Sequence, residues 1–164
     1  MDYQIREMNK NDWDSVLNIY QEGLASDIAT FNTEAPTYDE WDKAHLKDLR
    51  YVILVNNQVK GWIALSPTSS RYVYRGVCEV SIYITNDAKG KGLGTALFNY
   101  LIKESENKGI WTLYSSIIDL NKASINLHLK CGFRIVGYRE KIAQNRYHQW
   151  LNTIIMERRS KIIE

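Results

Sequence analysis

The stretch Lys89-Gly90-Lys91-Gly92-Leu93-Gly94-Thr95 decides how this chain is interpreted, because its alternating glycines lie between a predicted strand and a predicted helix. Glycine lets the backbone turn sharply and leaves the amide groups uncovered. At the start of a helix such amides point outward, and the helix dipole favours an anion there. Lys89 and Lys91 add positive charge. The stretch suits a pyrophosphate group, although a tight strand-to-helix corner alone would also explain the glycines.

Three kinds of phosphate loop compete for this stretch. A Walker loop closes on Gly-Lys-Ser/Thr, whereas here Gly92 is followed by Leu93 and Gly94. A dinucleotide-binding fold places Gly-x-Gly-x-x-Gly after its first strand, whereas these glycines alternate and lie past the middle of the chain. The third candidate is the pyrophosphate loop that binds coenzyme A.

Hydrophobic patterning around the stretch predicts both strands and helices. Alternation predicts strands over residues 3–8, 51–55, 59–65, 78–85, 112–118, 133–138 and 149–157. Apolar residues at helical spacing predict helices over 12–24 and from 92 onward, and capping signals predict two more over 37–48 and 121–131. Thr37 and Glu40 form a predicted capping box, and Asn121 is a predicted N-cap. This order of elements predicts an α/β fold with a mixed sheet.

Composition is typical of one soluble globular domain covering residues 1–164. The chain is 45% hydrophobic and 24% charged, with a net charge of +2 and no basic block that would favour a nucleic acid or a membrane surface. No apolar run is long enough for a signal peptide or a membrane span, so we expect a cytoplasmic protein. Cys78 and Cys131 lack metal-ligand spacing, and we expect two buried thiols and no metal.

Neighbouring stretches carry a resemblance to a known family. Glu79-Val80-Ser81-Ile82-Tyr83-Ile84, followed by the glycine-rich stretch, is similar to the central motif of GNAT acetyltransferases, with Lys89 at its first basic position. Three further stretches resemble the branch that acetylates phosphinothricin and methionine sulfone or sulfoximine. They are Ala29-Thr30-Phe31-Asn32-Thr33-Glu34-Ala35-Pro36-Thr37, Tyr74-Arg75, and Asn121-x-x-Ser124-x-x-Leu127-His128-x-x-x-Gly132-Phe133. The resemblance covers essentially the whole chain, in order.

This resemblance implies a mostly antiparallel, twisted sheet with splayed central strands and flanking helices. It implies acetyl-CoA as the cosubstrate, with its pantetheine on the open strand edge at Ile82, Tyr83 and Ile84. Asn121 and Ser124 would also contact CoA, although Asn121 equally suits a helix cap. The pyrophosphate would lie on the amides of Lys89, Gly90, Lys91, Gly92, Leu93, Gly94 and Thr95.

The resemblance also implies roles in acetyl transfer. An aliphatic amine is mostly protonated at neutral pH, so a base must take its proton, and Glu79 matches the family's strand glutamate. Apolar neighbours would raise the pKa of Glu79, although an ion-paired structural glutamate is the alternative. A backbone N–H near Tyr83 or Ile84 would stabilise the oxyanion. His128 would either protonate the leaving thiolate or pack and position CoA.

The acceptor implied by the resemblance is a small amine, an amino acid or an analogue of one. Phe31 and Glu34 would face it, and Arg71 or Arg75 would clamp its carboxylate, with Arg75 favoured. One departure leaves the identity of the acceptor open. Where relatives show Gly-Arg/Lys-Trp-x-Asp, this chain has His148-Gln149-Trp150-Leu151-Asn152.

Two rival functions use the same fold. One is a peptide or protein N-terminal acetyltransferase, which needs an open groove where this branch has a closed pocket. The other is a non-catalytic acyl-CoA-binding sensor, against which the presence of Glu79 counts. A homodimer is expected by analogy with relatives.

Overall fold

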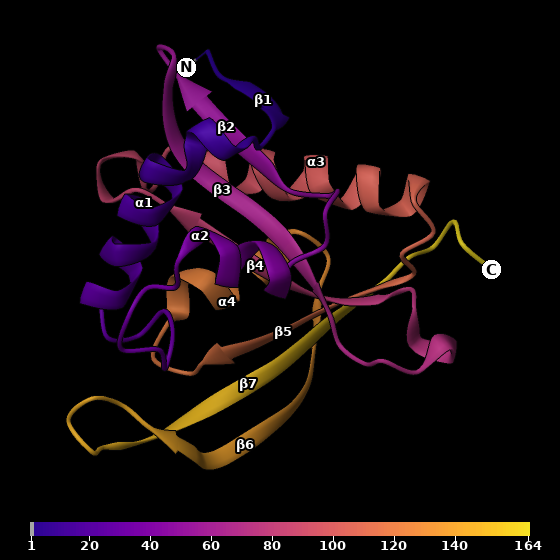
Figure 1. The fold of residues 1–164 in the computed structure, drawn as a ribbon. Helices are drawn as coiled ribbons and strands as arrows, with labels where there is room; N and C mark the ends of the chain where they lie inside the picture. Colours follow the sequence, from indigo (N-terminus) through magenta and orange to yellow (C-terminus); the bar gives the residue numbers. More distant parts are fainter. Residues whose placement is uncertain (1) are drawn as a thin grey trace.

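Figure 1 shows the computed structural model of the chain, which describes residues 2–164. Its seven-stranded sheet has the order β1-β2-β3-β4-β5-β7-β6. The strands are β1 (Gln4–Glu7), β2 (Tyr51–Val55), β3 (Gln58–Pro67), β4 (Val77–Ile84), β5 (Thr112–Ile118), β6 (Arg134–Gln144) and β7 (Trp150–Arg159). The helices are α1 (Trp13–Ala25), α2 (Tyr38–Ala44), α3 (Leu93–Asn107) and α4 (Lys122–Lys130). All neighbouring strands pair antiparallel except β4 and β5, which confirms the mixed, mostly antiparallel sheet.

Alternating side chains send the two faces of the sheet into separate cores. On β3, Ile63 and Leu65 join the core built by α3 and α4, whereas Trp62 and Ala64 join the core built by α1 and α2. Successive strand residues point to opposite faces, so a strand covered on both sides is apolar throughout. The helices therefore form one layer on each face of the central strands (Figure 1).

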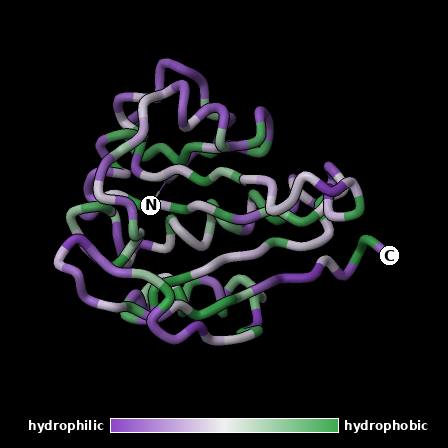
Figure 2. The backbone as a smooth tube through the Cα atoms, turned by 60° about the horizontal axis from the view of Figure 1, so that its bottom comes forward, coloured by the Kyte–Doolittle hydropathy of each residue, from purple (hydrophilic) through white to green (hydrophobic). Residues whose placement is uncertain are grey.

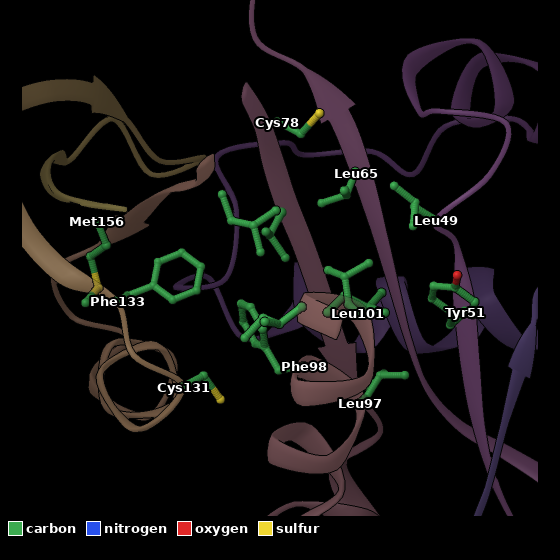
Figure 3. Packing of buried hydrophobic residues seen from close by; sticks show 14 of the residues in the cluster. Leu49, Tyr51, Leu65, Cys78, Leu97, Phe98, Leu101, Cys131, Phe133 and Met156 are labelled. Atoms are coloured by element: carbon green, nitrogen blue, oxygen red, sulfur yellow. The ribbon is translucent and has the colours of Figure 1, made fainter. Parts of the chain in front are cut away.

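The core on the α3 side is the larger one. Figure 3 shows Leu97, Phe98 and Leu101 of α3 pointing at the sheet, with Cys78 above them on β4 and Cys131 beside α4. Cys78 is 1% exposed and Cys131 is 7% exposed, and both are free thiols. Both cysteines are small buried hydrophobes, as predicted.

Strand β4 pairs with β5 over a short distance and then leaves it. The parallel register covers only Val77, Cys78 and Glu79, whereas β4 pairs with β3 from Cys78 to Ile84. Residues 80–84 of β4 therefore have one edge free of strand pairing, which is the splayed arrangement that the resemblance implied.

Most predicted elements are confirmed within two residues. The Thr37–Glu40 capping box and the Asn121 cap are both present. The helix predicted over 37–48 is wrong at its end: α2 stops at Ala44, because His45 is extended and the Leu46 amide donates to the Leu65 carbonyl at 2.8 Å. The strand predicted over 133–138 is too short, since β6 continues past an irregularity to Gln144.

Hydrophobic and hydrophilic positions are interleaved along the backbone (Figure 2). Within residues 2–164, no helix is both long and apolar enough to cross a membrane.

Gly76 lies where β4 and β5 meet, and a Cβ built on it would be 2.1 Å from the Trp111 ring. The Gly76 carbonyl also accepts from the amides of Trp111 and Thr112. We predict that Gly76→Ala lowers the free energy of unfolding by about 1–3 kcal/mol, because the ring must shift in a packed setting. Gly137→Ala is the control, since its Cβ would meet nothing within 4 Å. Urea unfolding of both variants measures the difference, and equal stabilities would contradict this packing.

Candidate active site

A cavity of about 1290 Å³ opens where β4 and β5 diverge. Strand β4, the turn after it and α4 line one end, which we call the cofactor end. The other end, which we call the acceptor end, lies over the opposite sheet face and is lined by α1, α2, the loop between them and β3. Glu79 on β4 lines the cavity where the two strands part.

The glycine-rich turn has the geometry of an anion cradle. Gly90 and Gly92 have φ of +75° and +81°, and a Cβ added to either would meet nothing within 4 Å. Their exposed amides precede α3, whose dipole favours negative charge. Lys89 lines the cavity, whereas Lys91 lies outside the lining and donates to the Asp87 carbonyl at 2.6 Å. Leu93, Gly94 and Thr95 complete this wall.

Helix α4 supplies the opposite wall of the cofactor end. The Asn121 side chain accepts from the Ser124 amide at 3.2 Å, so its oxygen caps the helix while the residue still lines the cavity. Ser124 lines the cavity as well. Capping and contact with a ligand are therefore compatible at Asn121.

Backbone direction on β4 decides which amides face the open edge. The Thr85 amide donates to the Lys60 carbonyl of the β3 hairpin at 2.9 Å. Since successive residues of a strand direct their amides to opposite edges, Tyr83 also faces β3, and Ile82 and Ile84 face the open edge. The assignment of Tyr83 as an oxyanion donor is therefore wrong. Its side chain is a wall of the cavity, stacked on Trp62 at 5.0 Å.

Glu79 has the environment of a general base. Its half-buried carboxylate has no hydrogen-bond or ion-pair partner among residues 2–164. Burial raises the pKa of Glu79 above its ordinary value. A carboxylate that is neither neutralised nor fully solvated is suited to accept a proton near neutral pH.

His128 does not have the geometry of a proton donor. It is 2% exposed, its Nδ1–H donates to the Ser124 carbonyl at 2.7 Å, and its Nε2 accepts from the Ser115 hydroxyl at 2.9 Å. Burial lowers the pKa of His128. The one proton of the neutral ring is held by the Ser124 carbonyl and the other nitrogen by Ser115, so neither nitrogen is free to protonate a thiolate and the geometry favours the packing role over the acid role.

The four residues predicted to bind the acceptor do not come together. Phe31 lines the cavity, whereas Glu34, Arg71 and Arg75 are exposed and lie outside its lining. The Arg75 guanidinium lies over the rings of Tyr72 and Trp111, at 4.2 and 5.2 Å, just before β4 begins. Neither Arg71 nor Arg75 lines this cavity, so the structure gives the predicted carboxylate clamp no support and it stays a prediction.

Aromatic residues that sequence reasoning missed form the walls of the acceptor end. They are Tyr20, Trp41, His45 and Trp62. Trp62 pairs with Tyr83, and residues paired across antiparallel strands share a face, but this register comes from the structure and not from a local sequence signal. Asn152 lies outside the lining and donates to Asp119 at 3.0 Å, so this departure from the branch does not alter the cavity wall.

No group of three or more His, Cys, Asp or Glu side chains within residues 2–164 is arranged to hold a metal ion.

Comparison with known proteins gives the family. Residues 13–133 match the model of the acetyltransferase (GNAT) family. The chain belongs to the GNAT acetyltransferase family. It is 30% identical to the L-methionine sulfoximine/L-methionine sulfone acetyltransferase of Pseudomonas aeruginosa, with 96% of this chain and 94% of that protein covered.

Two solved GNAT structures superpose over almost the whole chain. One is a phosphinothricin acetyltransferase from Sinorhizobium meliloti in complex with acetyl-CoA, with a TM-score of 0.87, 27% identity and coverage of 97% of this chain and 89% of that chain. The other is a ribosomal-protein-alanine N-acetyltransferase from Brucella melitensis, with a TM-score of 0.88, 26% identity and coverage of 96% and 99%. The family and these relatives make this protein an N-acetyltransferase, and acetyl-CoA supplies the thioester that it uses.

The residues of the cofactor end fit acetyl-CoA. The open edge of β4 offers unpaired backbone groups, and the Gly90–Gly92 turn leaves its amides uncovered. These features suit an extended amide-containing chain and a pyrophosphate, respectively.

We predict that Gly92→Ala and Gly109→Ala lower stability equally but differ in cofactor binding. Both glycines have positive φ and open space around them, so the added strain is about 1 kcal/mol in each. Only Gly92 lines the cavity. Thermal shifts with acetyl-CoA should be near wild type in Gly109→Ala and clearly reduced in Gly92→Ala. Equal shifts in the two variants would make the turn merely structural.

Proposed function

We propose that the enzyme transfers acetyl from acetyl-CoA to the α-amine of a small amino acid or analogue, by direct attack in a ternary complex. The observation that carries the proposal is the unpaired, half-buried carboxylate of Glu79 between the cofactor and acceptor ends of one cavity. An amine bound at the acceptor end has this carboxylate within the same enclosure. No covalent enzyme intermediate is required.

Two groups on β4 divide the work. Glu79 receives the proton that the ammonium must lose before its nitrogen can attack, either directly or through one water. The amides of Ile82 and Ile84 face the open edge and can donate to a carbonyl oxygen as negative charge grows on it. Both groups belong to one strand, so the register of β3 with β4 fixes them relative to each other.

A hydrogen bond and an ion pair between two loops support the proposal that the acceptor is small. Arg146, in the turn between β6 and β7, donates from Nη2 to the Leu24 carbonyl at 2.8 Å and pairs with Asp27 at 2.8 Å. Ser26 and Ile28 line the cavity and are sequence neighbours of Asp27. The contacts of Arg146 therefore hold the loop after α1 over the acceptor end. An extended peptide would need an open path there.

The test is thiol release from acetyl-CoA with a panel of amino acids, methionine sulfone, methionine sulfoximine and a peptide. We expect turnover with amino acids and little with the peptide. A peptide that outcompetes every amino acid would support the protein acetyltransferase function instead. Binding of acetyl-CoA without turnover on any amine would support the sensor function.

Glu79→Gln tests the base directly. We predict a loss of turnover of roughly 10²- to 10⁴-fold with acetyl-CoA affinity unchanged. The loss should shrink as pH rises, because more of the amine is already neutral. Unfolding measurements should show Gln at least as stable as Glu at neutral pH, since a raised pKa means that the ionised form is disfavoured in the folded state. Glu140→Gln, on exposed β6, is the control, and full turnover in Glu79→Gln would remove this residue from the mechanism.

A further inference from the structure

His45, directly after α2, is a polar group of the acceptor end that acetyl transfer does not use. Its ring stacks on Trp41 at 4.3 Å and meets Trp62 edge-on at 6.2 Å. Its Nδ1 is 2.7 Å from the Trp41 carbonyl oxygen, which can only accept, so Nδ1 carries the hydrogen. In the neutral ring Nε2 is then a lone-pair acceptor.

The Nε2 atom has no hydrogen-bond partner within residues 2–164. It is also not one of the fully buried polar atoms that lack a partner, so a ligand can reach it. His45 lines the cavity on the same sheet face as Trp62 and Glu79. The aromatic neighbours fix the plane of the ring, while one nitrogen stays available to a ligand.

The charges around His45 leave the ring neutral at physiological pH. Burial lowers the pKa of His45 and the Arg50 guanidinium lowers it further, while the hydrogen bond to the Trp41 carbonyl and the carboxylate of Asp42 oppose them. Asp42 and Arg50 pair with each other at 2.6 Å, which limits the influence of each. Trp62, the contact from β3, carries no charge.

Among the described residues, the rest of the acceptor end carries no positively charged side chain that would attract an anionic side chain. The only lysines in the lining are Lys89 and Lys130, from the turn after β4 and from α4, and no arginine lines the cavity in the described chain. The acidic lining residues are Glu40 and Glu79. A neutral side chain with a hydrogen to donate suits this end better than an anion.

We propose that His45 Nε2 accepts a hydrogen bond from the side chain of the acceptor, so that the enzyme prefers amino acids ending in an uncharged N–H or O–H donor. This preference rests on the proposed function. It concerns which acceptor is bound and not how acetyl-CoA binds. His45 touches the acceptor side chain and takes no part in moving the proton or the acetyl group.

Methionine sulfoximine and methionine sulfone form a matched pair for this test. They share size and shape, but the sulfoximine has an N–H where the sulfone has an oxygen. The sulfone would set a lone pair against Nε2 and leave the nitrogen without a donor. We expect kcat/KM to be about tenfold higher for the sulfoximine, mostly through KM, since this contact is equal in the bound and reacting states.

Three variants separate the hydrogen bond from packing. His45→Phe keeps a stacking ring without the acceptor atom, and its sulfoximine-to-sulfone ratio should fall to about one. His45→Gln offers an oxygen near the place of Nε2 and should restore part of the preference. His148→Gln, in the exposed turn before β7, should leave the ratio unchanged. If His45→Phe does not fold, the wild-type ratio against pH still decides, because protonation of Nε2 below its lowered pKa should erase the preference.

The outcomes distinguish the two proposals. A wild-type ratio near one at neutral pH, or a ratio that His45→Phe leaves intact, overturns the role of His45 while the enzyme still acetylates amino acids. If no amino acid is acetylated, the proposed function fails. Calorimetric binding of the two compounds to the CoA complex then tests His45 alone, and equal affinities overturn the inference.

Discussion

The end of the β4–β5 pairing after Glu79 is the constraint on which the rest of the site depends. Pairing as far as Glu79 fixes its carboxylate at the place where the two strands part. Beyond Glu79 the strands no longer pair, so the amides of Ile82 and Ile84 have no strand partners. Unpaired backbone groups are costly when buried, so an open edge inside a folded protein is stable only if water or a ligand reaches it. The cavity along residues 80–84 provides that access.

The two ends of the cavity follow from the two faces of β4. The cofactor end lies where β4 is followed by the turn with Gly90 and Gly92 and by the start of α3, which together suit an anion. The acceptor end lies over the face of β4 that carries Glu79 and Tyr83, opposite aromatic residues of α1, α2 and β3. In the function that we propose, one strand would therefore place the donor molecule and the acceptor molecule on either side of Glu79. Because β3 pairs with β4 from Cys78 to Ile84, the positions of Glu79 and of the free β4 amides relative to each other are set by the sheet.

Much of the fold was predictable, and the acceptor end was not. The glycine turn, the capping box at Thr37 and the alternating strands carry local signals, because turn conformation, helix caps and strand faces depend on nearby residues. Arg75 and His45 show the limit. Arg75 lies in a matching stretch, yet its guanidinium stacks on Trp111, and His45 enters the cavity only because α2 ends early and Leu46 bonds to β3. Such contacts join distant segments, and no local pattern encodes them.

Residue-resolved amide hydrogen exchange with and without acetyl-CoA tests the open edge most directly. The amides of Ile82 and Ile84 should exchange quickly in the free protein and become protected when acetyl-CoA binds. The amides of Ser81 and Tyr83 should be protected in both states, because they already face β3. Protection of Ile82 and Ile84 in the free protein, or no change on binding, would contradict the account.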